Sequence, residues 1–266
     1  MGTVKFYCVT NKEVNFINKD NHNLCWVGDG NSPKNYIQCD NGINIYDKEK
    51  YYSELTFHYW YWKNLLANED KDQWVGFCQK RRYWINKPYN NNINKNNINE
   101  HLFYDVPNEW SNYDAIICKP IDVSGVNKIK ILKRGFKNFI KDPSILYKKD
   151  KQNLYLHFDM HHGYGNLKKA ISELNDINKK DFELFMLKNT FFNPHIMFIS
   201  KPKIINEWFG ELFSWLNNCE KKFNFRNLKS YDTERLLAYL SERYLSYWFK
   251  KNYKCREENW IQLDNF

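Results

Sequence analysis

The sequence lacks the segments that would insert it into a membrane or export it. It has no run of about 18 apolar residues, the length that a transmembrane helix needs. Its start, MGTVKFYCVT, has no charged segment followed by a long apolar stretch, so we expect no signal peptide. The seven cysteines form no CxxC pair and no metal-type spacing, which favours free thiols in a reducing cytosol. We therefore expect a cytoplasmic protein, at most peripheral to a membrane.

Common cofactor and hydrolase motifs are also missing. The sequence has no GxGxxG, P-loop, HExxH or GxSxG. These absences argue against nucleotide-cofactor dehydrogenases, P-loop NTPases, zinc proteases of the HExxH type and α/β-hydrolases. The single Asp-x-Asp pair, Asp70 and Asp72, precedes an expected strand and is badly placed to hold the metal ion of a sugar nucleotide.

What the sequence does contain is positive charge and aromatic residues. The 266 residues have a net charge of +9, and 18% of them are Phe, Trp or Tyr. The aromatic side chains supply ample area for a folded core. The charge implies an anionic partner, which could be nucleic acid, a membrane surface or a phosphorylated metabolite.

The apolar pattern predicts early strands and late helices. We expect strands at 4–9, 73–78, 113–118 and 196–200, and helices at 48–68, 167–174, 180–188, from Pro202 onward and at 230–251. Residues 18–50 are expected to be loop, and 86–99 a low-complexity loop or lid that cannot bury itself. This order predicts one α/β sheet domain with a helical C-terminal part packed upon it.

Three consecutive cations follow an apolar strand in WVGFCQKRRYW, residues 74–84. Ligands of three-layer α/β folds bind outside the carboxyl ends of the strands. Arg81 and Arg82 could therefore grip phosphate oxygens in bidentate fashion, with Lys80 as a point charge. The alternative is a solvated basic turn.

Two further motifs combine carboxylates with imidazoles. In SELTFHYWYWKN (53–64), Glu54 and His58 are one helical turn apart, and we expect a hydrogen bond that is either a structural pair or part of a ligand site. In HFDMHHG (157–163), an extended run would place His157, Asp159 and His161 on one face. Three interpretations of these residues remain open: a general base, a metal site and an inert turn.

Two other positions are candidates with strong structural alternatives. Glu242 and Arg243 lie inside an apolar helix, where such a pair is usually structural but can also reach a pocket. His195 directly precedes a strand, where a histidine is more often a satisfied core residue than a ligand.

In order along the chain, VTNK (9–12), SELTFHYWYWKN, VGFCQKRRYW, YDAII (113–117), the turn near His162, NPHIMFI (193–199) and LSERYLSYWF (240–249) resemble the bacterial family named domain of unknown function 4422. By position, Glu54, Lys63, Arg81 and Arg82 match family motifs. Gln79 and Lys80 stand where the family has His-Tyr, and Asn166 where an acidic residue is commoner. The family comprises capsular polysaccharide and lipopolysaccharide glycosyltransferases.

The resemblance implies an α/β fold of the GT-A-like, Rossmann type, with a mixed sheet flanked by helices. It implies one glycosyltransferase domain over 1–266, with a nucleotide-sugar half at 1–120 and an acceptor-side, helical half at 121–266. The donor would be a nucleoside diphosphate sugar, UDP-linked, and the transfer could be galactofuranosyl. The acceptor would be a glycan or a lipid-linked glycan, with peripheral contact to anionic lipid as an option.

The same resemblance assigns roles to residues. Fixed cations at 79–82 would replace the divalent ion that many GT-A enzymes use, so no metal ligands are expected, with Mn²⁺ or Mg²⁺ as the alternative. The expected catalytic residues are Asp159, His162 and Glu54. The expected nucleotide-sugar residues are Thr10, Asn11, Lys12, Asn35, Ser53, Glu54, Lys63, Gln79, Lys80, Arg81, Arg82, His195, Glu242 and Arg243.

Two rival functions fit parts of the composition. A nucleic-acid-binding module would use the charge and the aromatic rings, but these rings concentrate on helices patterned for burial, so we expect no nucleic acid. A non-catalytic glycan-binding subunit is the other alternative. Donor sugar, linkage, anomeric outcome and oligomeric state do not follow from the sequence.

Overall fold

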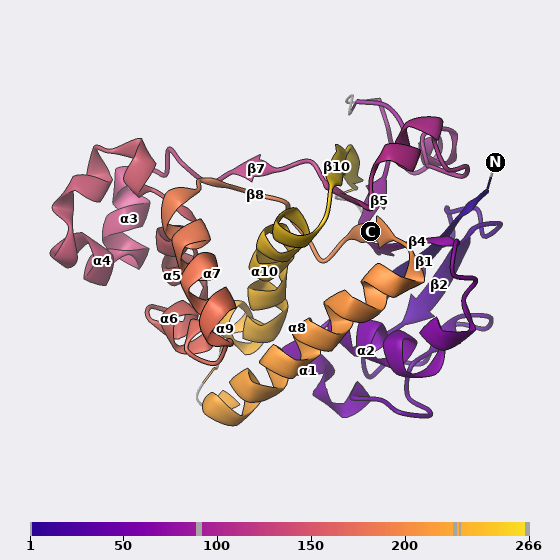
Figure 1. The fold of residues 1–266 in the computed structure, drawn as a ribbon, viewed down its shortest axis with the longest axis horizontal. Coiled ribbons are helices and arrows are strands. Elements are labelled where there is room, and N and C mark those ends of the chain that lie inside the picture. The colour runs from indigo at the N-terminus through magenta and orange to yellow at the C-terminus, as the bar shows by residue number, and fades with distance from the viewer. Residues whose placement is uncertain (1, 89–91, 226–227, 229, 264–266) are drawn as a thin grey trace. The chain divides into compact units, whose positions relative to one another are not determined.

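The structure is a computed structural model that describes residues 2–88, 92–225, 228 and 230–263. The chain divides into two compact units, each built from separate stretches of sequence (Figure 1). Unit 1 contains Met1–Lys119, His195–Glu211 and Trp248–Phe266, and unit 2 contains Pro120–Pro194 and Leu212–Tyr247. Helices α8 (Pro202–Lys222) and α10 (Leu236–Asn252) contribute residues to both units.

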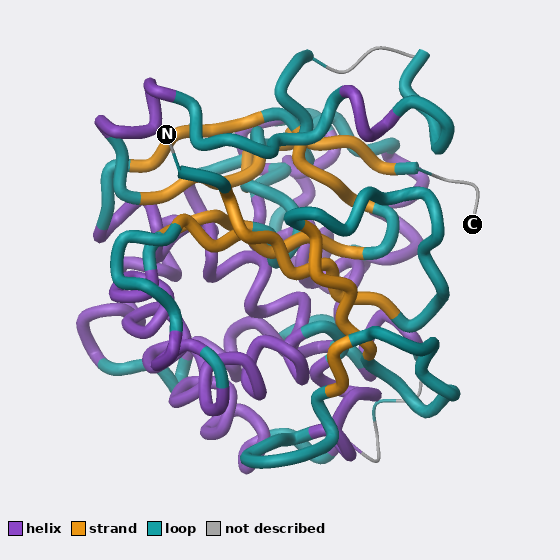
Figure 2. The backbone as a smooth tube through the Cα atoms, turned by 90° about the vertical axis from the view of Figure 1, so that its right-hand side faces the viewer, coloured by secondary structure: helices purple, strands orange, loops and turns teal. Residues whose placement is uncertain are grey.

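Unit 1 is organised around a mixed sheet (Figure 2). Its strands are β1 (Val4–Thr10), β2 (His22–Trp26), β3 (Ile37–Gln38), β4 (Trp74–Gln79), β5 (Arg82–Trp84), β6 (Ala115–Cys118), β9 (Phe198–Ser200), β10 (Cys255–Glu258) and β11 (Trp260–Gln262). The main order is β10-β6-β9-β4-β1-β2-β3, and β5 pairs with both β4 and β11.

The direction of the strands decides where their ends lie. β1 pairs in parallel with β2 and β4, β2 with β3, and β10 with β6. β9 runs antiparallel between β4 and β6, so these two strands share one direction. The strands of common direction therefore end along one edge of the sheet, which we call the carboxyl edge.

The predicted strands are confirmed, but two loop predictions are wrong. β1, β4, β6 and β9 match the expected strands at 4–9, 73–78, 113–118 and 196–200 to within two residues at each end. The reading of 18–50 as loop is wrong because β2 and β3 lie within it. The sequence of β2, HNLCW, has little strand pattern of its own, and its backbone is held by parallel pairing with β1.

The stretch 86–99 is also more ordered than expected. Ile93 and Ile98 are buried in the core cluster of unit 1, so the expectation that this stretch cannot bury itself is wrong. Residues 89–91 of the stretch lie outside the described part of the chain.

The helix expected at 48–68 is interrupted. Helix α1 (Glu49–Tyr52) ends at Ser53, whose φ of 53° is a left-handed value that breaks the helical pattern. Helix α2 (Leu55–Asn64) follows directly. Tyr61 of α2 packs against aromatic rings of β1 and β4, which fixes this helix on the sheet.

Unit 2 is mainly helical. Its elements include α3 (Lys128–Arg134), α4 (Phe136–Lys141), α5 (Leu154–His162), α6 (Asn166–Ile171), α7 (Asp176–Lys188), α9 (Tyr231–Glu234) and the small ladder of β7 (Ile121–Asp122) with β8 (Phe191–Phe192). The ring of Phe182 lies 5.1 Å from that of Tyr244 and 6.0 Å from that of Trp215, at the centre of the unit's core. The expected helices at 167–174 and 180–188 correspond to α6 and α7, and the one at 230–251 is divided into α9 and α10.

The extended reading of HFDMHHG is wrong, because these residues end helix α5. The side chain of Asn153 accepts the N–H of Leu156 and caps the start of the helix, and Gly163, with φ of 95°, follows its last residue. His157 and His161 are consequently one turn apart, with ring centroids separated by 4.6 Å. A helix, unlike a strand, does not bring His157, Asp159 and His161 to one face.

The remaining connections are short. One-turn 3₁₀ segments occur at Tyr46–Lys48, Leu66–Asn68, Ile98–Glu100, Asn108–Asn112, Pro143–Leu146 and Lys149–Lys151. Within the described ranges, no helix combines the length and the apolar character that crossing a bilayer requires. All seven cysteines are thiols, as their spacing predicted, and all but Cys255 are buried.

The position of the Phe6 ring against β4 depends on Gly76. A Cβ atom at this position would lie 2.5 Å from the ring of Phe6 and 3.1 Å from Ile199, both fully buried. We expect Gly76→Ala to lower the free energy of unfolding by about 1–3 kcal/mol, because the core has no room for the methyl group. Urea denaturation measures the loss. The control Gly2→Ala, where nothing lies within 4 Å, should be neutral, and equal effects of both substitutions would contradict the packing argument.

Candidate functional site

The loops that follow β1 and β4 meet at the carboxyl edge of unit 1. The hydroxyl of Thr10 accepts the N–H of Lys12 at 3.0 Å and donates to its carbonyl at 2.6 Å, which makes the first loop tight. The N–H of Lys80 donates to the carbonyl of Val9 at 3.1 Å, and the Lys80 ammonium donates to the side-chain oxygen of Asn11. The two loops therefore form one polar surface.

The cationic run reverses direction as soon as β4 ends. Gln79 pairs with Arg82 across the β4–β5 hairpin, and Arg82 Nη1 donates to Gln79 Oε1 at 2.7 Å. Lys80 and Arg81 thus form the two-residue turn itself. Their side chains are half-buried, as is that of Arg82, so the solvated basic turn is a poor description.

Each arginine of this turn keeps a buried donor without a partner. Nε of Arg81 and Nε of Arg82 are both inaccessible to solvent and make no hydrogen bond within the described part of the chain. Leaving a buried donor unsatisfied is costly, and such groups are rare in folded proteins. An oxyanion bound at this edge is a ligand that guanidinium groups recognise well.

Aromatic residues after the arginines anchor the hairpin. Tyr83 and Trp84 are fully buried, and the Trp84 indole N–H donates to the carbonyl of Phe77 at 2.9 Å. On the other side, the N–H of Leu263 donates to the carbonyl of Arg81 at 2.8 Å. The hairpin is thereby fixed between β4 and β11, and this explains why a cationic turn is followed by two large rings.

The carboxyl edge also includes residues that the sequence did not single out. Gly28 follows β2 with φ of 95°, and a Cβ atom there would lie 3.5 Å from Asn11 and 4.0 Å from the carboxyl carbon of Glu49. The Tyr46 hydroxyl donates to the Gly28 carbonyl. The glycines of GDGN were a signal of close backbone approach, but neither Tyr46 nor Glu49 lies in a recognisable motif.

The side-chain hydrogen bond expected between Glu54 and His58 is not formed, although the backbone N–H of His58 donates to the carbonyl of Glu54 at 3.3 Å. His58 is buried against Phe77 and Phe209, and its Nδ1 has no hydrogen-bond partner in the described chain. Glu54 is half-buried at the N-cap of α2 and makes no capping bond with its side chain, and Ser53 before it is buried. The helix turns His58 towards the aromatic core, where a neutral imidazole is preferred.

Three other candidates are dispersed. Lys63 lies at the opposite end of α2 from Glu54, with its ammonium 3.3 Å from the ring centre of Trp62. Asn35 is exposed in the turn before β3, with φ of 71°. His195 precedes β9, whose start lies at the carboxyl edge because the strand is antiparallel, and its ring contacts that of Trp260 at 4.5 Å.

In unit 2, Arg243 is a buried cation with several partners. Its guanidinium pairs with Glu242, lies 3.6 Å from the ring centre of Phe192 and approaches Nδ1 of His157 at 3.3 Å. Its Nε is buried and makes no hydrogen bond in the described chain. Desolvation and the nearby Arg243 lower the pKa of His157 to about 2, so this imidazole is neutral.

The two candidate catalytic residues of unit 2 have different surroundings. Asp159 is buried, which raises its pKa, and its oxygens accept from Asn138 at 3.0 Å and from the N–H of Gly165 at 3.1 Å. His162 stacks on Tyr239, with ring centroids 3.9 Å apart. Burial, with a smaller contribution from the charge of Arg243, lowers the pKa of His162 to about 3.

The tautomer of His162 follows from its partner. Its Nδ1 lies 3.1 Å from the carbonyl oxygen of Asp232, and because a carbonyl only accepts, Nδ1 must carry the proton. Nε2 is then an unprotonated nitrogen, and it makes no hydrogen bond within the described residues. The sequence could not reveal this partner, because Asp232 contributes its backbone rather than its side chain.

A family model described as domain of unknown function 4422 matches residues 5–253. The chain belongs to this family. The resemblance of its motifs to DUF4422 is thereby confirmed. No protein with a curated description matches the chain at a significant level.

Among solved structures, this DUF4422 chain is similar to the apo structure of WbbM, a bifunctional glycosyltransferase. The TM-score is 0.70 at 20% sequence identity, and the match covers 99% of this chain and 46% of WbbM. The chain thus spans less than half of the length of that protein. The match and the mixed sheet with flanking helices establish the expected GT-A-like fold.

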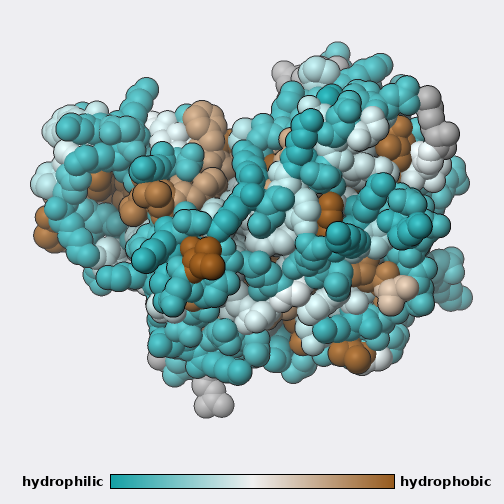
Figure 3. Space-filling model, viewed as in Figure 1, coloured by the Kyte–Doolittle hydropathy of each residue, from teal (hydrophilic) through white to brown (hydrophobic). Residues whose placement is uncertain are grey.

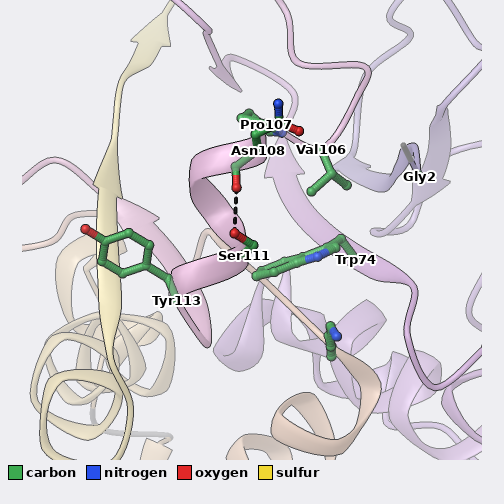
Figure 4. Close-up of a pocket in the computed structure, with 8 residues that line it drawn as sticks. Gly2, Trp74, Val106, Pro107, Asn108, Ser111 and Tyr113 are labelled. Carbon is green, nitrogen blue, oxygen red and sulfur yellow. Dashed lines mark hydrogen bonds between the residues drawn. The ribbon is translucent and has the colours of Figure 1, made fainter.

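A pocket of about 490 Å³ lies in unit 1 of the DUF4422 chain, away from the carboxyl edge (Figure 4). Its lining includes Trp74, the first residue of β4, and Tyr113, just before β6, so it lies at the amino ends of these strands. Ser111 donates to the Asn108 carbonyl at 2.7 Å in its wall. Across the described chain, no three His, Cys, Asp or Glu side chains gather as metal ligands would.

The buried position of His58 predicts a pH-dependent stability. Burial lowers its pKa to about 3, whereas an unfolded histidine titrates near 6.5, so the unfolded state binds more protons as the pH falls below that value. Stability is therefore lost with falling pH. Replacing His58 with Phe should reduce the loss between pH 7.5 and pH 5.5 by about 1.4 kcal/mol, measured by urea denaturation at both pH values.

The control for this substitution is Phe209→Leu, which changes a neighbour of His58 without removing a titratable group. It should lower stability equally at the two pH values. A wild-type pH dependence retained in full by His58→Phe would show that His58 is not the neutral, buried group described above.

Proposed function

We propose that the protein is a glycosyltransferase that moves a sugar from a nucleoside diphosphate to a glycan acceptor. The observation that supports this most strongly is the pair of buried, unsatisfied Nε donors of Arg81 and Arg82 at the carboxyl edge of a GT-A-like sheet. That edge is where ligands bind in open α/β sheets. WbbM, which shares the fold, is named a bifunctional glycosyltransferase.

On the donor side, we propose that Lys80, Arg81 and Arg82 bind the diphosphate and neutralise the charge that develops as it leaves. Fixed cations in a partly dry site stabilise such charge without reorganisation. Asn11 positions the Lys80 ammonium, and Thr10 and Lys12 shape the adjoining loop. We propose a UDP-linked donor, with UDP-galactofuranose as one candidate for a donor screen.

The chemistry of this edge does not suit a divalent cation. β4 ends with the amide Gln79 and three cations follow it, whereas Mg²⁺ or Mn²⁺ prefers carboxylate oxygens. The acidic pair Asp70 and Asp72 precedes β4, and Asp72 is paired with Lys201 at 3.3 Å. We therefore propose that donor binding does not require a metal ion, and EDTA controls test this directly.

On the acceptor side, we propose His162 as the general base that removes the proton from the attacking hydroxyl. Its Nδ1–H is held by the Asp232 carbonyl, so Nε2 is available to accept a proton. Asp159 is better suited to positioning, since its carboxylate holds the backbone of Gly165 and the side chain of Asn138. We assign Arg243 to the support of this region, because its guanidinium pairs with Glu242 and lies on the ring of Phe192.

The donor-side proposal predicts a loss of nucleotide affinity. Arg81→Met and Arg82→Met should each weaken UDP binding by about 10- to 100-fold, because each removes charge-assisted hydrogen bonds to phosphate. Isothermal titration with UDP in the presence of EDTA measures this. Lys71→Met removes the same charge from an exposed position before β4 and should leave affinity unchanged. Unaltered UDP affinity in both arginine variants would refute the diphosphate role.

The acceptor-side proposal predicts a separation of catalysis from donor binding. His162→Gln should lower kcat of sugar transfer by roughly 10²- to 10⁴-fold and leave UDP affinity unchanged, as expected for loss of a general base. Asp159→Asn should lower the melting temperature, because the amide nitrogen of Asn cannot accept a hydrogen bond and one of the bonds from Asn138 and Gly165 is lost. Its effect on kcat should be smaller than that of His162→Gln. The reverse order of effects on kcat would assign the base to Asp159.

A further inference from the structure

The segment 126–141 is the most strongly cationic stretch of unit 2. It contains Lys128, Lys130, Lys133, Arg134, Lys137 and Lys141 and no acidic residue. We call these six side chains the basic border, and all six are exposed. None of them forms an ion pair within the described chain, whereas Lys151, Lys179 and Lys222 of the same unit are paired with carboxylates.

An apolar stripe runs beside these cations. Ile129, Leu132, Phe136 and Ile140 are 61%, 39%, 54% and 63% exposed and recur at spacings of three, four and four residues. Gly135 separates α3 from α4, because its φ of −105° and ψ of 20° lie outside helical values. Ile129 and Leu132 are three residues apart on one side of α3, and Phe136 and Ile140 are four residues apart on one side of α4.

Other side chains of α3 and α4 fix these helices to the unit. Ile131 is fully buried in a cluster with Ile145, Leu156 and Met160, and Phe139 packs against it. The apolar stripe is thus not needed to close this core. Figure 3 shows hydrophobic surface among hydrophilic surface where Figure 1 draws α3 and α4.

Aromatic rings lie among the cations of this face. The ammonium of Lys128 is 4.3 Å from the ring centre of Tyr147, which is 74% exposed. Those of Lys137 and Lys141 are 5.3 Å and 5.1 Å from the ring centre of Tyr164. Tyrosines and lysines with aliphatic stems are enriched where a protein meets the headgroup region of a bilayer.

The combination of exposed apolar and cationic side chains favours an anionic bilayer over a nucleic acid as the partner. A single-stranded nucleic acid needs aromatic faces on which bases stack, but three of the four residues of the stripe are branched aliphatic side chains rather than planar rings. Exposed aliphatic side chains beside cations without ion pairs suit a surface that lies in a membrane interface, with its apolar groups among acyl chains and its cations among anionic headgroups.

We propose that the exposed face of α3 and α4, made of the apolar stripe and the basic border, binds the surface of bilayers that contain anionic phospholipid. This inference is independent of the proposed transfer reaction, because it rests on residues that neither the donor-side nor the acceptor-side proposal uses.

Co-sedimentation with lipid vesicles tests the proposal. The full chain is mixed with vesicles of phosphatidylcholine alone or with about 30% phosphatidylglycerol, at about 100 mM and about 500 mM salt. We expect binding to the anionic vesicles at least about tenfold stronger than to the neutral ones, and weaker binding at high salt. Equal binding to both vesicle types, or none, would overturn the proposal.

Paired variants locate the surface. The changes Lys133→Glu with Lys137→Glu, and separately Phe136→Ser with Ile140→Ser, should each weaken binding to anionic vesicles by about tenfold or more. The matched controls are Lys180→Glu with Lys188→Glu, and Ile177→Ser with Leu184→Ser, all at exposed positions of α7. Controls that lose binding as strongly as the face variants would contradict the assignment.

Two further measurements separate lipid binding from misfolding and from nucleic-acid binding. Because every substituted side chain is exposed, the variants should keep the wild-type melting temperature and the wild-type affinity for UDP. A gel shift with single-stranded RNA completes the comparison. RNA binding that depends on the same residues, in the absence of vesicle binding, would replace a membrane surface with nucleic acid as the partner.

Discussion

The parallel pairing of β1 with both β2 and β4 determines where the polar loops of unit 1 meet. Parallel strands deliver their following residues to the same edge, so the loops after Thr10, Trp26 and Gln79 become neighbours although they are distant in sequence. The hydrogen bond from Lys80 to Asn11 and the position of Gly28 near Asn11 both depend on this pairing. Because the chain then reverses in a tight hairpin after β4, Arg81 and Arg82 both lie at this edge.

Much of this edge could be predicted from sequence because the relevant signals are local. WVGFC has the continuous apolar character of a strand covered on both faces, and the rule for carboxyl ends places Arg81 and Arg82 near a ligand. β2 could not be predicted in the same way, since HNLCW becomes a strand only through its partner β1. Likewise, HFDMHH was ambiguous by pattern, and a cap from Asn153 with a stop at Gly163 decides for the helix.

The site residues show the same division between local and distant information. The candidate histidines were visible as a cluster, but the protonation of His162 depends on the backbone of Asp232, a partner far along the chain. The predicted side-chain bond between Glu54 and His58 is wrong because spacing alone does not say which face of α2 is turned to the core. Tyr46 and Glu49 were missed because only the folded arrangement of loops brings them to Gly28.

The bracing of the arginine turn by β11 affects the order in which the protein can form. β5 has its partner strand near the end of the sequence, and the carbonyl of Arg81 is held by Leu263. During synthesis, β4 and the turn leave the ribosome long before that partner exists. The local pairing of Gln79 with Arg82 needs no such partner, whereas the outer edge of β5 and the Arg81 carbonyl stay unpaired until the C-terminal strand has been made.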